Sequence, residues 1–147
     1  MNVGSVFFDG EFEFHDGETG EKLFVVIGNT SGVALVSKTT SKQRGKGTAF
    51  GCQHADRFPN FYLPPGCCYL KTSTWVCLDE FYELNFAAVL QKRFQNIIKF
   101  VCTLEPTLVR QIQECASESL DITDFQRTIV GACLVTPPAA NNPPTSG

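Results

Sequence analysis

The sequence has few of the residues and motifs on which common hydrolases and nucleotide-binding proteins depend. Only two of its 147 residues are histidines, His15 and His54. It contains no G-x-S-x-G nucleophile elbow, no recognisable Cys–His protease signature, no Walker phosphate loop and no G-x-G-x-x-G fingerprint. These absences disfavour hydrolases and nucleotide-binding proteins of those classes.

The chain also lacks an excess of positive charge and a long apolar run. Its net charge is −3, so no global positive field attracts nucleic acid. No segment approaches the roughly 18 apolar residues of a membrane span, and the N-terminal residues lack the basic start and apolar run of a signal peptide. We therefore expect a cytoplasmic protein without a membrane segment, and we expect its thiols to be reduced.

Cysteine is present in an odd number, seven, which does not indicate a disulfide framework at this length. Four possible zinc ligands occur as Cys52-x-His54 followed by Cys67 and Cys68. Their spacing does not match the paired C-x2-C or H-x3-H modules of structural zinc sites. We expect no metal and no cofactor, and we interpret the cysteines as small buried residues.

Hydrophobic periodicity predicts short strands followed by helices, in one domain over residues 1–135. The pattern from 86 to 101 is typical of a helix, although its last part fits a strand equally well. A helix should follow Pro106, with Thr103 as its N-cap, and Thr123 with Gln126 should form a capping box before another helix.

Residues 136–147, with four prolines, should be a disordered tail. The succession of short strands and then helices predicts an α+β fold with a curled antiparallel sheet or barrel and helices on one side. The expected strands are 4–14, 22–29, 33–39, a segment near 60–63, and 72–84.

One stretch concentrates positive charge: SKTTSKQRGKG, residues 37–47, has four basic residues and no acidic one. It is interpreted either as a solvated loop or as a site where an anion binds. If Lys22 faces the same groove, cations there would stabilise the charge that develops on a phosphate during transfer. The basic residues of the stretch are Lys38, Lys42, Arg44 and Lys46.

Proton transfer at such a site would need His15, Asp79 or a similar group. Each candidate also has an ordinary interpretation: His15 as a surface histidine, Lys22 as a solvent-facing strand end, and Asp79 as a structural carboxylate. Glu80 follows Asp79 on the predicted strand. Neighbouring strand residues point to opposite faces, so we expect Glu80 to be a solvated residue and the two carboxylates not to act as a pair.

Several short segments, in their order and spacing over residues 4–118, resemble the MazF/PemK family of toxin endoribonucleases. The resemblance implies an SH3-like antiparallel β-barrel with C-terminal helices, usually a homodimer. It further implies metal-independent cleavage of single-stranded RNA by 2′-OH transesterification, which leaves a 2′,3′-cyclic phosphate, and neutralisation by an antitoxin. The matching segments are GSVFF (4–8), KLFVVIG (22–28), LVSKTTSK (35–42), TWVCLDE (74–80) and VCTLEPTLVRQI (101–112).

Carried over by position, the resemblance implies catalytic roles for Lys22, Thr39 or Thr40, Asp79 and His15. It also implies that the basic stretch holds RNA through Lys38, Lys42, Arg44 and Lys46. Two family arginines are missing: Lys22 replaces one, and the apolar Cys77 or Leu78 stands at the other. Lysine lacks the planar fork that grips phosphate in a bidentate manner. An alternative is therefore a catalytically decayed barrel that binds protein or nucleic acid, and a third is an unrelated α+β enzyme or interaction protein.

Overall fold

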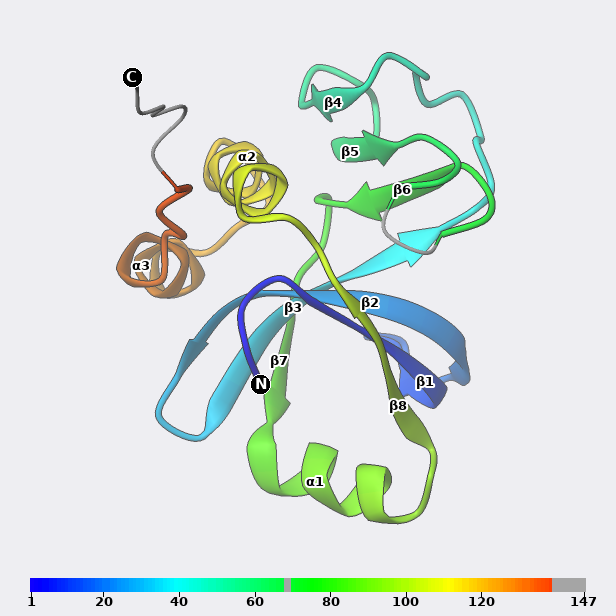
Figure 1. Ribbon diagram of the computed structural model, residues 1–147, viewed down its shortest axis with the longest axis vertical. Coiled ribbons are helices and arrows are strands. Elements are labelled where there is room, and N and C mark those ends of the chain that lie inside the picture. Colours follow the sequence, from blue (N-terminus) through cyan, green and yellow to red (C-terminus); the bar gives the residue numbers. More distant parts are fainter. Residues whose placement is uncertain (68–69, 139–147) are drawn as a thin grey trace, which may run out of the picture.

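The computed structural model describes residues 1–67 and 70–138, and these residues form an α+β fold of eight antiparallel strands and three helices (Figure 1). The α+β class and the antiparallel sheet predicted from the sequence are confirmed. The strands are β1 Ser5–Glu13, β2 Thr19–Thr30, β3 Val33–Thr40, β4 Gly51–Gln53, β5 Asn60–Leu63, β6 Thr74–Cys77, β7 Tyr82–Asn85 and β8 Ile98–Thr103, and the helices are α1 Phe86–Phe94, α2 Pro106–Ser117 and α3 Asp124–Ala132.

Strand β3 is the centre of the sheet, because it pairs with three other strands. The ladder runs β4-β5-β6-β3-β2-β1-β8, with β7 added beside β3. The first half of β3, Val33–Val36, pairs with β7, whereas Thr39 and Thr40 at its end pair with β6. Figure 1 shows the resulting division, with β4, β5 and β6 above and the remaining strands below. Over the described residues the ladder is an open path from β4 to β8.

Two hydrophobic clusters lie on the two sides of β2. Phe24, Val25, Val26 and Ile27 are all buried, because both faces of this strand are covered. Val25 and Ile27 belong to the cluster that α2 and α3 cover, and Phe24 and Val26 belong to the cluster closed by α1. Aromatic rings dominate the second cluster, which is where much of the chain's phenylalanine lies.

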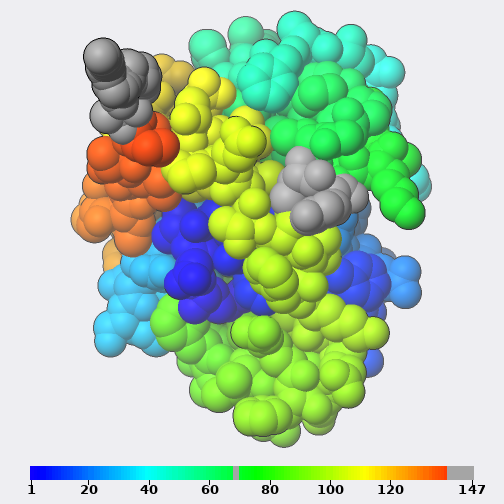
Figure 2. All heavy atoms as spheres, viewed as in Figure 1, coloured from blue at the N-terminus to red at the C-terminus, as the bar shows by residue number. Residues whose placement is uncertain are grey.

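Helix α2 packs between α3 and the strands β4 and β5, as the space-filling view shows (Figure 2). Its side chain Gln113 is fully buried and uses all of its amide. The Gln113 nitrogen donates to the carbonyls of Ile27 (3.0 Å) and Cys133 (2.8 Å), and its oxygen accepts from the amide of Val135 (2.9 Å). One polar side chain thus ties the helix to β2 and to the segment after α3.

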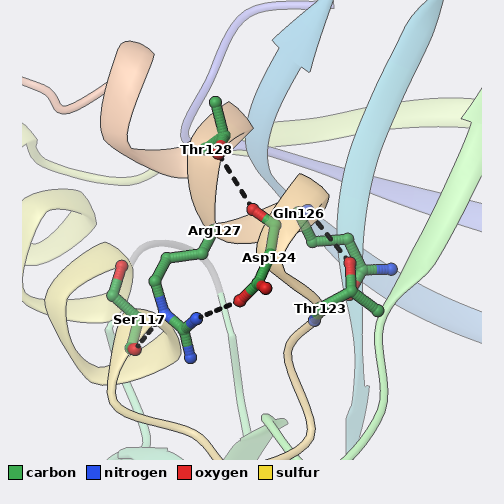
Figure 3. A network of polar contacts seen from close by, with 6 residues as sticks. All are labelled: Ser117, Thr123, Asp124, Gln126, Arg127 and Thr128. Carbon is green, nitrogen blue, oxygen red and sulfur yellow. Dashed lines mark hydrogen bonds and ion pairs between the residues drawn. The ribbon is translucent and has the colours of Figure 1, made fainter.

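Helix α3 begins at the capping box that the sequence predicts. Thr123 accepts from the backbone N–H of Gln126, and the Gln126 side chain accepts from the backbone N–H of Thr123. Figure 3 shows this cap beside Arg127, which donates to Asp124 and to the carbonyl of Ser117 at the end of α2 (both 3.1 Å). The network fixes the turn between the two helices.

Two expectations about elements need correction. The segment 72–84, predicted as one strand, is divided into β6 and β7, because the chain turns between them and buries Leu78 and Phe81 in the turn. The helix after β8 has Glu105, not Thr103, at its N-cap, since β8 continues through Thr103.

The remaining expectations are resolved differently. Both interpretations of 86–101 hold in part, as α1 followed by β8. Most of the predicted tail, residues 139–147, lies outside the described residues. No helix in the described part of the chain is long and apolar enough to cross a membrane.

The expectation of fully reduced cysteines is also wrong for this structure. Cys52 on β4 and Cys115 on α2 form a disulfide, with their Cα atoms 5.6 Å apart and a sequence separation of 63. The two cysteines are far apart in the chain, so only the packing of α2 against β4 brings them together.

Candidate functional site

Positive side chains converge where β2 begins and where β3 and β6 end. Lys22 lies near the start of β2, and Lys38 lies near the end of the antiparallel β3, opposite Phe24. The basic loop leaves β3 at this point, and the turn after β6 brings Asp79 to the same place. The resulting pocket has a volume of about 320 Å³ and is lined by Lys22, Lys38, Thr40, Lys42, Arg44, Lys46, Phe58, Cys77 and Asp79.

The basic loop has a defined shape. Arg44 adopts a left-handed backbone (φ 46°), which non-glycine residues rarely occupy, and Gly45 continues it (φ 83°). The Gln43 side chain donates to the carbonyl of Lys46 (2.7 Å), and the Lys46 backbone N–H donates to the carbonyl of Gln43 (2.9 Å). These bonds turn the loop back over the pocket.

The end of the loop is anchored to the sheet. The indole N–H of Trp75 and the side-chain amide of Gln53 both donate to the carbonyl of Gly47, each at 2.9 Å. Lys46 is only 8% exposed and lies over the ring of Phe58, with its Nζ 5.6 Å from the ring centre. Lys46 is thus a wall of the pocket, whereas Lys42 and Arg44 are exposed.

The two strand lysines have different electrostatic settings. Lys22 donates to the carbonyl of Thr39 (3.1 Å), and burial together with Lys38, Lys42 and Arg44 lowers its pKa. Lys38 forms an ion pair with Glu80, and this partner outweighs the effect of burial, so the pKa of Lys38 is raised. Since Glu80 neutralises Lys38, Lys22 is the strand cation better placed to attract an anion.

Asp79 brings a carboxyl group into the cationic pocket. Burial raises its pKa, its own backbone N–H opposes that effect, and Glu80 adds to it. A raised pKa makes this carboxyl a better proton acceptor than an ordinary aspartate. Neighbouring Cys77 is a neutral thiol, because burial and the charge of Asp79 raise its pKa to about 11.

The two threonines at the start of the basic stretch face different surroundings. Thr39 is buried, and its hydroxyl donates to the carbonyl of Leu23 (3.1 Å), so its side chain is outside the pocket. Thr40 lines the pocket, and its hydroxyl oxygen accepts from the backbone N–H of Lys42 (3.1 Å). That bond does not use the hydroxyl hydrogen of Thr40, which can donate to an anion.

His15 lies outside the cationic pocket. Its Nε2 donates to the carbonyl of Phe81 (2.9 Å), and its ring stacks on Tyr82 with the centres 3.9 Å apart. It lines another pocket, of about 450 Å³, together with residues such as Lys92. The Tyr82 hydroxyl donates to Glu80, the partner of Lys38, so His15 adjoins the pocket only through this chain of contacts.

No protein-family model matches the chain, and no curated protein matches it. The assignment of a function therefore rests on the arrangement of its own residues.

Sequence reasoning found most of the pocket and missed part of it. Seven predicted site residues line it: Lys22, Lys38, Thr40, Lys42, Arg44, Lys46 and Asp79. The role of Glu80 as the partner of Lys38 was missed, because a continuous strand would have directed it to the other face. The aromatic wall formed by Phe58 was missed as well. The available signal was the pair Leu78 and Phe81, apolar residues that flank two acids as they do in a turn anchored at both ends.

Proposed function

We propose that the protein is a toxin-type, metal-independent endoribonuclease that cleaves single-stranded RNA at this pocket. The observation that carries the proposal is the convergence of five cationic side chains and one half-buried carboxyl on a single cavity. Cations in this number suit a polyanion, and the carboxyl supplies a proton acceptor beside it. The open antiparallel sheet is compatible with a distorted SH3-like barrel of the MazF/PemK kind.

The proposed reaction needs only the substrate and the pocket. Asp79 takes the proton of the ribose 2′-OH, and the 2′-oxygen attacks the neighbouring phosphorus. Lys22 stabilises the charge on the phosphorane, and Thr40 orients a phosphate oxygen. The bond to the 5′-oxygen breaks, and Lys22, whose lowered pKa makes it the stronger acid, gives this oxygen a proton. The products are a 2′,3′-cyclic phosphate and a 5′-hydroxyl.

The proposal extends to partners and place of action. RNA cleavage of this kind requires control, and an antitoxin protein with acidic groups that covers the pocket would provide it. Exposed apolar side chains on α1 and β8, including Leu90, Phe94 and Phe100, suit a homodimer contact. The substrate places the activity in the cytoplasm.

The test is cleavage of a long single-stranded RNA in the presence of EDTA. We expect the wild-type protein to cut and to leave cyclic phosphate ends. Lys22→Ala should lower the rate by about 100-fold or more, because the phosphorane loses a donor. Lys99→Ala, an exposed lysine outside the pocket, is the matched control and should cut at the wild-type rate. Equal rates for Lys22→Ala and the wild type would refute the proposal.

The second candidate is a binding module without cleavage. It is favoured because the side chains of Thr39 and His15, two of the expected catalytic residues, lie outside the pocket. Of the two expected proton-transfer groups, Asp79 is the one that lines it. In the same assay, retention of intact RNA by the wild type, weakened in Lys22→Ala, would support this candidate over the nuclease.

A further inference from the structure

The disulfide between Cys52 and Cys115 lies among other metal-binding groups. Cys52, His54 and Glu118 are exposed, and each offers a ligand atom within 4.8 Å of the other two. The Cys52 sulfur is 3.7 Å from Nδ1 of His54. Cys115 adds a second sulfur, since it is bonded to Cys52.

The four residues lie together because β4 and α2 pack against each other, and each presents two of them on the same side. Cys52 and His54 are two residues apart along β4 and just beyond it, so their side chains leave the same side of the strand. Cys115 and Glu118 are three residues apart at the end of α2, so they share a helix face. The packing of α2 on β4 turns the two pairs toward each other.

We propose that the reduced protein binds a zinc ion with Cys52, His54, Cys115 and Glu118. Two thiolates, an imidazole and a carboxylate are ligands that zinc accepts in tetrahedral geometry. In such a site the ligand atoms are about 3.3–3.8 Å apart, as follows from bond lengths near 2.0–2.3 Å. The ligand atoms of Cys52, His54 and Glu118 need to approach one another by only about 1 Å at most to reach this range. The two sulfur atoms are bonded in the oxidised protein, and they must move apart to reach it once the bond is reduced.

Zinc and the disulfide exclude each other, because the metal requires thiolates. A cellular dithiol reduces the disulfide: two electrons and two protons pass to Cys52 and Cys115, and the dithiol becomes a disulfide. Zinc binding then releases the two thiol protons. The site is therefore a redox-controlled metal site, and it does not depend on the proposed nuclease activity.

The surroundings of the site leave room for a reductant and for zinc. A surface pocket of about 590 Å³ is bordered by Cys52, Cys115 and Glu118, and Cys52 is exposed, so a reductant and the metal can reach its sulfur atom. Cys115 is buried and becomes available once the bond to Cys52 is broken. Gln53, between two of the ligands, donates to the carbonyl of Gly47 at the end of the basic loop. The metal site thus adjoins the element that forms the wall of the anion pocket.

The experiment measures zinc binding by the full chain with and without reduction. Under nitrogen, protein treated with a phosphine reductant should bind one zinc ion per chain, and the oxidised protein should bind none with comparable affinity. Cobalt(II) in place of zinc should give the near-ultraviolet absorption of thiolate-to-cobalt charge transfer. The reduced, zinc-loaded protein should re-form the Cys52–Cys115 disulfide more slowly with oxidised glutathione than the zinc-free protein does.

Variants separate this site from other thiols. His54→Ala and Glu118→Gln change exposed residues and keep both cysteines, and each should weaken zinc binding at least about tenfold. The double variant Cys67→Ser/Cys133→Ser removes two free thiols and should bind zinc as the wild type does. The proposal is overturned if reduction does not increase zinc binding, if both exposed-ligand variants keep the wild-type affinity, or if the double variant loses it.

Discussion

At the scale of single residues, Glu80 determines how the charges of the pocket are divided. It pairs with Lys38 and accepts from Tyr82, so one of the two strand lysines is neutralised. The same negative charge contributes to the raised pKa of Asp79. The pocket also holds two groups whose pKa values are shifted in opposite directions, because burial lowers the pKa of Lys22 and raises that of Asp79.

The raised pKa of Asp79 predicts a pH dependence of stability. The folded state holds this proton more tightly than the unfolded chain does, so stability falls as pH rises from 3.8 through the folded pKa. Asp79→Asn removes this contribution. Urea unfolding between pH 4 and pH 7 should show a smaller loss of stability for Asp79→Asn than for the wild type.

The control for this prediction is Glu18→Gln, an exposed carboxylate that does not line the pocket, which should follow the wild-type curve. Parallel curves for Asp79→Asn and the wild type would show that Asp79 does not have a raised pKa. A cleavage assay on the same variants gives an independent result, because the nuclease proposal requires Asp79→Asn to be inactive.

At the scale of elements, the basic loop is fixed by hydrogen bonds and presents two exposed cations. Its anchors are the bonds of Gln43 with Lys46 and the bonds of Trp75 and Gln53 to Gly47. Lys42 and Arg44 are exposed along this turn, so their contribution to anion binding is separate from the folding of the loop.

Removing the two exposed cations should change the salt dependence of RNA binding. Each phosphate contact with single-stranded RNA contributes about 0.7 to the slope of log affinity against log salt. Lys42→Ala/Arg44→Ala should therefore reduce that slope by about 1.4, measured by fluorescence anisotropy at several salt concentrations. Arg93→Ala/Lys99→Ala makes the same change of charge on exposed residues outside the pocket and should leave the slope as it is. An unchanged slope for Lys42→Ala/Arg44→Ala would show that the loop is a solvated connection that does not contact RNA.

Elements with a strong local signal were predicted well. The strand at 60–63 and the capping box of Thr123 and Gln126 depend on residues that are close together in the sequence, and both predictions are confirmed. The break between β6 and β7 was not predicted, because alternation alone continues through Leu78 and Phe81. Those two side chains are buried in the turn by distant partners, and the alternation alone does not distinguish this burial from that of a continuous strand.

At the scale of the whole molecule, helix α2 joins the two parts of the structure. The disulfide fixes it to β4, and the buried amide of Gln113 fixes it to β2 and to the chain after α3. The disulfide joins residues that are far apart in sequence, so it restricts the unfolded chain as well as holding the folded one, whereas the hydrogen bonds of Gln113 act in the folded state.

Reduction of the disulfide should lower stability markedly. A crosslink over 63 residues restricts the unfolded chain by an amount worth roughly 4 kcal/mol. Urea unfolding of Cys52→Ser and the wild type without reductant, in the presence of a chelator, should show this loss. Reductant should lower stability at least as much, because it also acts on Cys102, which is disulfide-bonded as well. Cys67→Ser is the control and should unfold as the wild type does. Equal midpoints in oxidised and reduced protein would contradict the prediction.

The sequence by itself determined the local features: the basic stretch after a strand, the amphipathic helices and their caps, and the α+β class. These depend on residues that are neighbours in the chain or one helical turn apart. Only the tertiary structure decided what the basic stretch faces, how Glu80 divides the charge, and that Cys52 meets Cys115. Those outcomes depend on which distant segments pair and pack, and that is decided by the burial of the whole apolar surface rather than by local periodicity.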